Sequence, residues 1–300
     1  MQELAPIILF VYNRLWHVKK TVESLKANDL ASESRLFIYS DSAKNDGDTK
    51  KVFQVRNYIR KINGFRSINI NEREKNFGLA ANVISGVSEI LKQYNKIIVL
   101  EDDIVCSSSF LSYMNNLLNF YSSNKKIYSV TGYTFPIKIP GNYKFDVYLA
   151  PRASSWGWGT WADRWNEVDW EITDFNDFIN DISKVKQFNK GGDDLSKMLK
   201  REMNGQIDSW AIKWSYAHYK HNAYCIYPIK SRIINIGADE SGVHTRKTKR
   251  FDVPLFNDKK KLNLPYNTEP NLEIMRNFKS FFNQNRIFKS FHYLRDLLHI

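Results

Sequence analysis

Three consecutive carboxylates, Glu101, Asp102 and Asp103, follow the apolar residues 97–100, which have the length and composition of a buried strand. No basic residue lies close to them in the sequence. Carboxylates repel one another, so a cluster at a partly buried strand end needs a cation or shared protons. Carboxylate oxygens favour Mg²⁺ or Mn²⁺, which complete their shells with water and phosphate oxygens. The triplet therefore predicts a metal-bridged diphosphate site, and the alternative is a solvated acidic turn.

Strand-like and helix-like segments alternate along the first hundred residues. Apolar runs predict strands at residues 6–12, 35–41, 67–70 and 96–103. Apolar residues at helical spacing predict helices between them, at residues 18–25, 52–59 and 78–91. This alternation is typical of a parallel sheet with helices on both faces, so we expect an α/β fold.

Polar residues follow three of these four strands. Asn13 and Arg14 come after the first strand, Asp41 ends the second, and the acidic triplet ends the fourth. Ligands of an open parallel sheet bind outside the carboxyl ends of its strands. We therefore expect these side chains to converge on one site.

The composition changes after about residue 150, where five of the eight tryptophans fall within residues 156–170. We interpret residues 1–150 and 151–250 as two halves of one unit, followed by a basic, aromatic tail at 251–300. In the tail, helical spacing places Phe278, Phe281 and Phe282 on one side. The tail is predicted either to contact the inner membrane surface or to pack on the domain or on a partner subunit.

The net charge of +12 raises the question of nucleic-acid binding. Much of the excess lies between residues 244 and 300, which hold twelve Lys/Arg and five Asp/Glu. The first residues lack the layout of a signal peptide, and no stretch approaches the roughly 20 apolar residues of a membrane span. Cys106 and Cys225 are far apart and suggest neither a disulfide framework nor a zinc site. A cytoplasmic protein is the prediction.

Seven motifs, in order between about residues 5 and 245, together resemble bacterial sugar transferases of polysaccharide gene clusters. They are PIILFVYNR, YSDSAKN, NFGLAAN, IIVLEDDIVCSSSFLSYMN, SWGWGTWADRW, IDSWAIKW and YPIKSRIINIGADESGVH. Those enzymes are related to the eukaryotic N-acetylglucosaminyltransferase that starts complex N-glycans. The resemblance implies the GT-A fold, in which a mixed, mostly parallel sheet joins a Rossmann-like nucleotide-binding half to an acceptor-binding half.

The resemblance also assigns residues to a nucleotide-sugar donor. It makes the triplet the DXD element, with Asp103 on Mn²⁺ or Mg²⁺ and with Glu101 and Asp102 on the ribose and sugar. The further donor-binding residues that it implies are Asn13, Arg14, Asp41, Asn76, Gly78 and His244, and His244 is also a candidate metal ligand. For Asp41, Asn13 and Gly78 the alternatives are a turn residue, a helix cap and a turn glycine; for His244 the alternative is a surface residue.

On the acceptor side, Asp208 matches the catalytic base of the related enzymes, where the acid shortly precedes a tryptophan. Its alternative is the N-cap of the helix predicted to follow it. Trp156 or Trp158, flanked by glycines, is predicted to contact the acceptor sugar, so both are candidate acceptor-binding residues, and most of Trp161, Trp165 and Trp170 are predicted to be core.

These assignments predict a metal-dependent, inverting glycosyltransferase. Its donor would be a UDP-sugar such as UDP-N-acetylglucosamine. Its acceptor would be a glycan, either lipid-linked or without a lipid. One alternative is a retaining enzyme of the same fold. The other is a non-enzymatic basic protein that binds nucleic acid or anionic surfaces. That alternative accounts for the charge but not for acids at several strand ends, so we expect no nucleic-acid partner.

Overall fold

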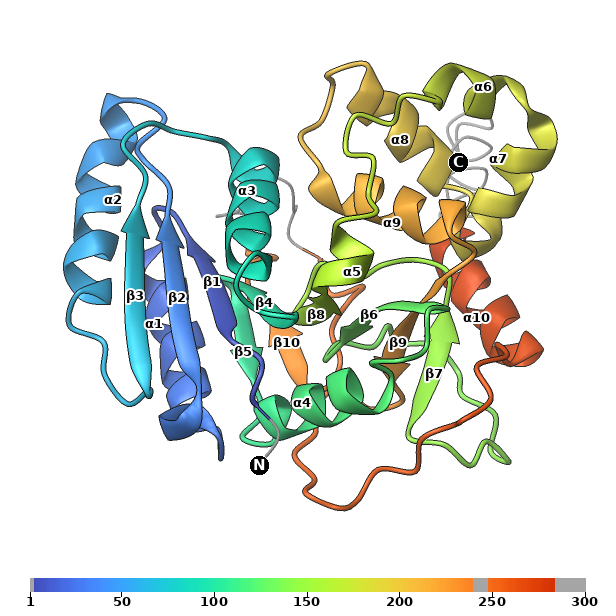
Figure 1. Cartoon of the computed structure of the whole chain (residues 1–300), viewed down its shortest axis with the longest axis horizontal. Coiled ribbons are helices and arrows are strands. Elements are labelled where there is room, and N and C mark those ends of the chain that lie inside the picture. The colour runs from blue at the N-terminus through green and yellow to red at the C-terminus, as the bar shows by residue number, and fades with distance from the viewer. Residues whose placement is uncertain (1–2, 240–247, 284–300) are drawn as a thin grey trace, which may run out of the picture.

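The computed structural model describes residues 3–239 and 248–283, and an eight-stranded sheet forms the centre of this part (Figure 1). The strands lie in the order β3-β2-β1-β4-β8-β6-β9-β7. Their bounds are β1 Ile7–Val11, β2 Arg35–Ser40, β3 Ser67–Glu72, β4 Lys96–Glu101, β6 Ile127–Thr131, β7 Val147–Ala150, β8 Trp158–Trp161 and β9 Tyr224–Pro228. Strands β8 and β7 run antiparallel to their neighbours and the other six share one direction. The predicted mixed, mostly parallel α/β sheet is confirmed.

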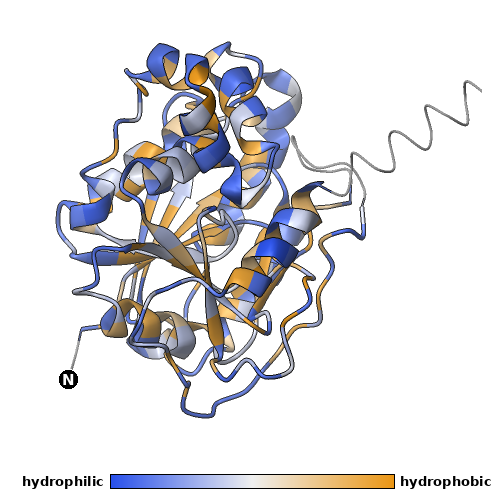
Figure 2. Ribbon diagram, turned by 90° about the vertical axis from the view of Figure 1, so that its right-hand side faces the viewer, coloured by the Kyte–Doolittle hydropathy of each residue, from blue (hydrophilic) through white to orange (hydrophobic). Residues whose placement is uncertain are grey.

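The alternation predicted for the first hundred residues is confirmed as well. The three helices between the first four strands are α1 (Leu15–Lys26), α2 (Asp46–Ile59) and α3 (Leu79–Leu91). Buried side chains of α1 and α2 join Ile7, Leu9 and Val11 on one face of the sheet, where α4 (Phe110–Phe120) also packs. Helix α3 packs with Ile8 and Phe10 on the other face. Figure 2 shows hydrophobic residues along the strands at the centre of the molecule.

The sheet continues without a break from the first half of the chain into the second. Strand β8 enters between β4 and β6, although residues 102–157 separate it from β4 in the sequence. Gly159 lies so close to β4 that a Cβ there would stand 2.7 Å from the Ile97 carbonyl oxygen. The strand pairing therefore crosses the division predicted at residue 150.

Helix α9 (Trp210–Lys220) covers β8 on the face of the sheet that α3 also occupies. Its residues Trp210 and Trp214 pack against Trp158 and Trp165, with ring centroids 4.9–6.1 Å apart between Trp158 and the other three. This confirms that Trp165 is core. Trp161 is also buried, whereas Trp170 is partly buried against the same cluster.

The remaining elements form smaller units at the edges of the sheet. The short strands β5 (Ile104–Cys106) and β10 (Ile233–Asn235) pair antiparallel in a separate two-stranded sheet. A helical cluster with its own apolar core stands beside α9. The short elements are η1 Ala31–Glu33, α5 Ala162–Trp165, α6 Phe175–Asn180, α7 Ile182–Phe188, η2 Asn189–Gly191 and α8 Leu195–Met203.

The described part of the tail ends in α10 (Leu272–Asn283), which packs on the domain. Phe278 and Phe281 are buried, and Phe278 lies against Tyr148 of β7 and Tyr227 of β9. The prediction that the phenylalanines share one side is confirmed, and that side faces the sheet. Within residues 3–239 and 248–283, no helix has both the length and the apolar character that crossing a membrane requires.

Candidate active site

The acidic triplet lies at the carboxyl end of β4, next to the carboxyl end of β1. The two strands are parallel neighbours with Phe10 opposite Glu101, so Arg14, just beyond β1, reaches the acids that follow β4. Its Nη2 donates to Oδ1 of Asp102 and, at 2.8 Å, to Oδ2 of Asp103. Although no basic residue lies close to the triplet in the sequence, Arg14 therefore places a positive charge beside it. The guanidinium is distant in sequence and arrives through strand pairing.

One guanidinium does not balance three carboxylates. Burial, followed by the charges of Asp103 and Asp102, raises the pKa of Glu101 to about 8. Burial also raises the pKa of Asp102, although Arg14 acts against it. Burial by itself would lower the pKa of Arg14, but the charges of Asp102 and Asp103 outweigh it and raise that pKa. The cluster holds excess negative charge that a further cation would stabilise.

Asp103 receives contacts from a second segment of the chain. The Nδ2 of Asn235 donates to Oδ1 of Asp103 at 3.1 Å, and the Ile236 N–H donates to the Asp103 carbonyl oxygen at 2.9 Å. The backbone of Gly237 lies against the carboxylate, and a Cβ there would stand 2.1 Å from Asp103 Oδ2. Sequence reasoning missed Asn235 and Gly237, although both lie within the last of the seven motifs.

An unpaired donor is buried at the same place. Nη1 of Arg14 has no hydrogen-bond partner among the described residues, and the Cβ position of Gly237 lies 3.0 Å from it. A buried donor without a partner costs about 1–3 kcal/mol, so an anionic oxygen that entered here would be stabilised. In the described part of the chain, the site thus combines excess carboxyl groups with one guanidinium nitrogen that has no partner.

The donor atoms present fit a hard divalent cation. Within the described residues, no group of three or more His, Cys, Asp or Glu side chains is arranged to enclose a metal ion. Mg²⁺ commonly binds through only one or two carboxylates together with water and phosphate oxygens. Asp103, with an excess of negative charge beside it, supplies that kind of ligand.

Asp41 is buried at the carboxyl end of β2 and holds the loop that precedes α3. Its Oδ1 accepts from the N–H groups of Ser42 and Phe77, both at 2.9 Å. Its Oδ2 accepts from the Gly78 N–H at 3.1 Å and from Asn76 Nδ2 at 3.2 Å. Three predicted donor-binding residues, Asp41, Asn76 and Gly78, are thus joined in one hydrogen-bonded loop.

Asn13 belongs to a different contact. Its Nδ2 donates to Oδ1 of Asp48 at 2.8 Å, and Tyr12 Oη donates to Oδ2 of the same side chain at 3.0 Å. Asp48 lies in the first turn of α2. The side chain of Asn13 is therefore directed toward α2, unlike that of its neighbour Arg14.

Asp208 is exposed, and its side chain contacts the start of α3 instead of capping α9. Its Oδ2 accepts from the Ala80 N–H at 3.3 Å, and a Cβ on Gly78 would stand 3.2 Å from the same oxygen. The N-cap of α9 is Ser209. The alternative interpretation of Asp208 as the cap of its own helix is therefore wrong. This carboxylate reaches from the second half of the chain to the loop that Asp41 organises.

The two predicted acceptor-binding tryptophans differ in exposure. Trp158 is 0% exposed and lies inside the tryptophan cluster, so the prediction that it contacts an acceptor is wrong. Trp156 is partly exposed, with ring centroids 4.6 Å from Tyr133 and 5.7 Å from Phe251. Of these two tryptophans, only Trp156 has an exposed surface that an acceptor could contact.

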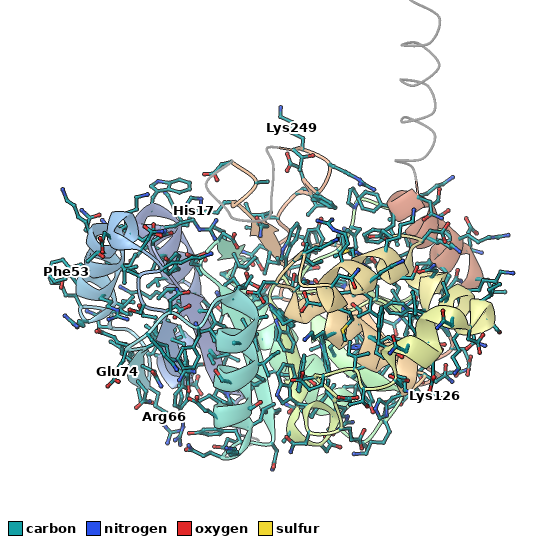
Figure 3. All side chains as sticks on the ribbon, turned by 90° about the horizontal axis from the view of Figure 1, so that it is seen from above. His17, Phe53, Arg66, Glu74, Lys126 and Lys249 are labelled. Carbon is teal, nitrogen blue, oxygen red and sulfur yellow. The ribbon has the colours of Figure 1, made fainter. Side chains whose placement is uncertain are left out.

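His244 lies outside the described residues, and the described chain that precedes it contacts α1. His17 of α1 contacts Asp239, with Nε2 and Oδ2 3.1 Å apart. Figure 3, seen from above Figure 1, shows His17 and Lys249 on the same side of the molecule, away from Arg66 and Glu74.

A separate groove between α7, α9 and α10 shares none of its lining residues with the acidic triplet or with Asp208. Its lining includes Lys190, Tyr219 and Arg276. The groove does not contribute to the arrangement around β4.

None of the protein-family models and none of the curated proteins matches the chain. Among solved structures, S. aureus TarS (residues 1–349) is similar at 12% identity with a TM-score of 0.40, over 76% of this chain and 59% of that chain. The mannosyltransferase PcManGT from Pyrobaculum calidifontis, in complex with GDP-Man and Mn²⁺, is similar at 12% identity with a TM-score of 0.36, over 55% and 49%. A cytidylyltransferase from Leptospira borgpetersenii is similar at 13% identity with a TM-score of 0.34, over 56% and 64%.

The chain thus spans less than two thirds of the length of each of these chains. The similarity concerns the outline of the fold and carries no argument about activity.

Proposed function

We propose that the protein is a metal-dependent, inverting glycosyltransferase that uses a nucleotide-diphosphate sugar. The observation that carries this proposal is the cluster at the end of β4, where three carboxyl groups outnumber one guanidinium and a buried Arg14 nitrogen has no hydrogen-bond partner among residues 3–239 and 248–283. A divalent cation and a diphosphate together supply the missing positive charge and the missing acceptor oxygen. The resemblance of the seven motifs to bacterial sugar transferases supports the same conclusion.

On the donor side, Asp103 would hold Mn²⁺ or Mg²⁺, with His244 as a second candidate ligand. When bound, the metal ion would neutralise charge on the departing diphosphate. Nη1 of Arg14 would donate to a phosphate oxygen, and Glu101 and Asp102 would contact the ribose and sugar. The donor-binding set is completed by Asn13, Asp41, Asn76, Gly78 and His244.

On the acceptor side, Asp208 would take the proton from the attacking hydroxyl group. The acceptor oxygen forms a bond to the anomeric carbon while the bond from that carbon to the diphosphate oxygen breaks. The nucleoside diphosphate leaves with the electron pair, and the configuration inverts. General-base catalysis of this kind contributes about 10²–10⁴-fold. Trp156 would stack on the acceptor sugar.

The donor that we propose is a UDP-sugar, with UDP-N-acetylglucosamine as the first candidate, and the acceptor is a glycan of a bacterial surface polysaccharide. A lipid-linked acceptor would place the enzyme at the cytoplasmic face of the membrane. Because α10 is packed on the sheet, membrane contact would fall to the residues after Asn283. Liposome flotation of the chain with and without residues 284–300 tests this part, and equal flotation would exclude it.

The experiment that tests the core proposal combines thermal shift with turnover. UDP-sugars and GDP-sugars are added with and without Mn²⁺ to the wild type and to Asp103→Ala, Asp208→Ala and Asp177→Ala. We expect Asp103→Ala to abolish the metal-dependent shift. Asp208→Ala should keep the shift and lose turnover, and the exposed control Asp177→Ala should behave as wild type. Normal turnover of Asp208→Ala would refute the base assignment, and NMR of the product anomer tests inversion.

A further inference from the structure

Helix α8 ends in a tight turn that is closed by hydrogen bonds to the last residues of the helix. The Gln206 N–H donates to the Arg201 carbonyl oxygen and the Gly205 N–H to the Glu202 carbonyl oxygen, both at 2.9 Å. Gly205 has a φ of +68°, the left-handed conformation that such a helix-ending turn requires. The chain then reaches Asp208 within three residues.

Glu202, in the last turn of α8, contacts this returning chain. Its Oε2 accepts from the Ser209 N–H at 2.8 Å. Its Oε1 lies 3.5 Å from Nζ of Lys213 in α9, and the Glu202 side chain is only 8% exposed. The Glu202 carboxylate therefore contacts both ends of the first turn of α9, at Ser209 and at Lys213, and connects that turn to α8.

This contact replaces a cap that α9 lacks. Ser209 is the N-cap residue, and its side chain makes no capping hydrogen bond. In a capping box, the third residue of a helix accepts from the N–H of the N-cap. Here the acceptor comes from the preceding helix, so the backbone immediately after Asp208 is fixed to α8.

We infer that Glu202 is a positioning residue that holds Asp208 in place as the catalytic base. This inference rests on the proposed function. Asp208 is exposed, and its described contact is the 3.3 Å bond from the Ala80 N–H of α3. Glu202 fixes the peptide on the other side of it. Together the two contacts locate the Asp208 carboxylate between the donor-side loop and the start of α9.

The test compares Glu202→Ala, Glu202→Gln and Lys213→Met in steady-state kinetics. Glu202→Ala removes the acceptor, and misplacement of a catalytic group by about 1 Å costs on the order of 10²-fold. We expect its kcat to fall roughly 10–100-fold while the KM for the donor stays within about twofold. Glu202→Gln keeps an oxygen for the Ser209 N–H and should retain most of kcat. Lys213→Met removes only the ion pair and should resemble Glu202→Gln.

A double variant separates positioning from a general loss of structure. A residue that acts through Asp208 has nothing left to position when Asp208 is Asn, so Glu202→Ala should not lower kcat further in that background. If Glu202→Ala lowers the residual rate of Asp208→Asn by the same factor as in the wild type, or if Glu202→Ala keeps wild-type kcat, the inference is wrong.

The outcomes also distinguish this inference from the proposed function. Full activity of Asp208→Asn would refute the assignment of the base and the positioning role with it. Loss of activity in Asp208→Asn together with wild-type kcat in Glu202→Ala would refute the positioning role alone. Circular dichroism and melting temperatures of every variant report whether each protein is folded during the assay.

Discussion

Replacing Asp41 with Ala should destabilise the protein measurably, because this carboxylate is the acceptor that organises the loop before α3. Asp41 is 6% exposed, and its two oxygens accept four hydrogen bonds, three of them from backbone N–H groups. The Ala side chain leaves those donors without an acceptor in a space that is largely closed to water.

The size of the effect follows from the three backbone donors. At about 1 kcal/mol for each donor, the free energy of unfolding falls by about 3 kcal/mol. For a chain of this length, 1 kcal/mol corresponds to roughly 2 °C, so the melting temperature should drop by about 6 °C. Asp41→Asn keeps one acceptor oxygen and should fall between Asp41→Ala and the wild type.

Differential scanning calorimetry at pH 7 measures this effect, with Asp177→Ala as the control for loss of an exposed carboxylate. If Asp41→Ala and Asp177→Ala melt within 1 °C of each other, the carboxylate does not hold the loop. The donor-free protein is the correct sample, since a bound nucleotide sugar would stabilise the loop by itself.

Two further predictions concern stability. Burial lowers the pKa of His218 to about 4 from its ordinary 6.5, so the unfolded chain binds a proton that the folded chain does not. The contribution of His218 to the free energy of unfolding should therefore be largest above pH 6.5 and fall by about 3 kcal/mol as the pH drops to about 4. The raised pKa of Glu101 acts in the opposite sense, so urea titrations should compare wild type with His218→Gln at each pH. The difference in the free energy of unfolding between the two proteins should change by about 3 kcal/mol over this range, and a constant difference would contradict the assignment. Phe278→Ala should cost about 3–5 kcal/mol, whereas Leu272→Ala, 80% exposed on the same helix, should cost less than about 0.5 kcal/mol. Equal effects in urea denaturation would mean that α10 does not depend on its buried face.

The local elements could be predicted from the sequence because each is encoded by neighbouring residues. The apolar residues of α1, α2 and α3 recur at helical spacing, and the four strands between them are short apolar runs. The order of strands across the sheet depends on contacts between distant segments. The entry of β8 beside β4 has no local signal and could not be foreseen. The convergence of Arg14 with the acids after β4 follows from the predicted parallel sheet, but its direct ion pairs with Asp102 and Asp103 depend on β1 being the neighbour of β4.

The error at Trp158 has a specific physical cause. The acceptor prediction for Trp158 depends on the glycines that flank it in the sequence. Gly159 instead makes room for another strand, since a Cβ there would meet the Ile97 carbonyl oxygen at 2.7 Å. A glycine indicates that another group approaches the backbone closely, but it does not indicate whether that group is a ligand or a neighbouring strand. Glu202 had no signal in the sequence, because its contact depends on the path of the chain after Gly205.

The order of the strands across the sheet constrains how the protein folds during synthesis. Strands β1 to β4 can pair as soon as residue 101 has been made. Strand β6 pairs with β8 and β9, and β7 pairs only with β9. Strands β6 and β7 are therefore synthesised before any strand with which they pair. The apolar residues 127–131 and 147–150 therefore stay unpaired until residue 228 has emerged, apart from the contacts that β8 provides to β6. Unpaired strands of this kind are prone to aggregate, so slow translation or a chaperone should matter most between residues 131 and 228.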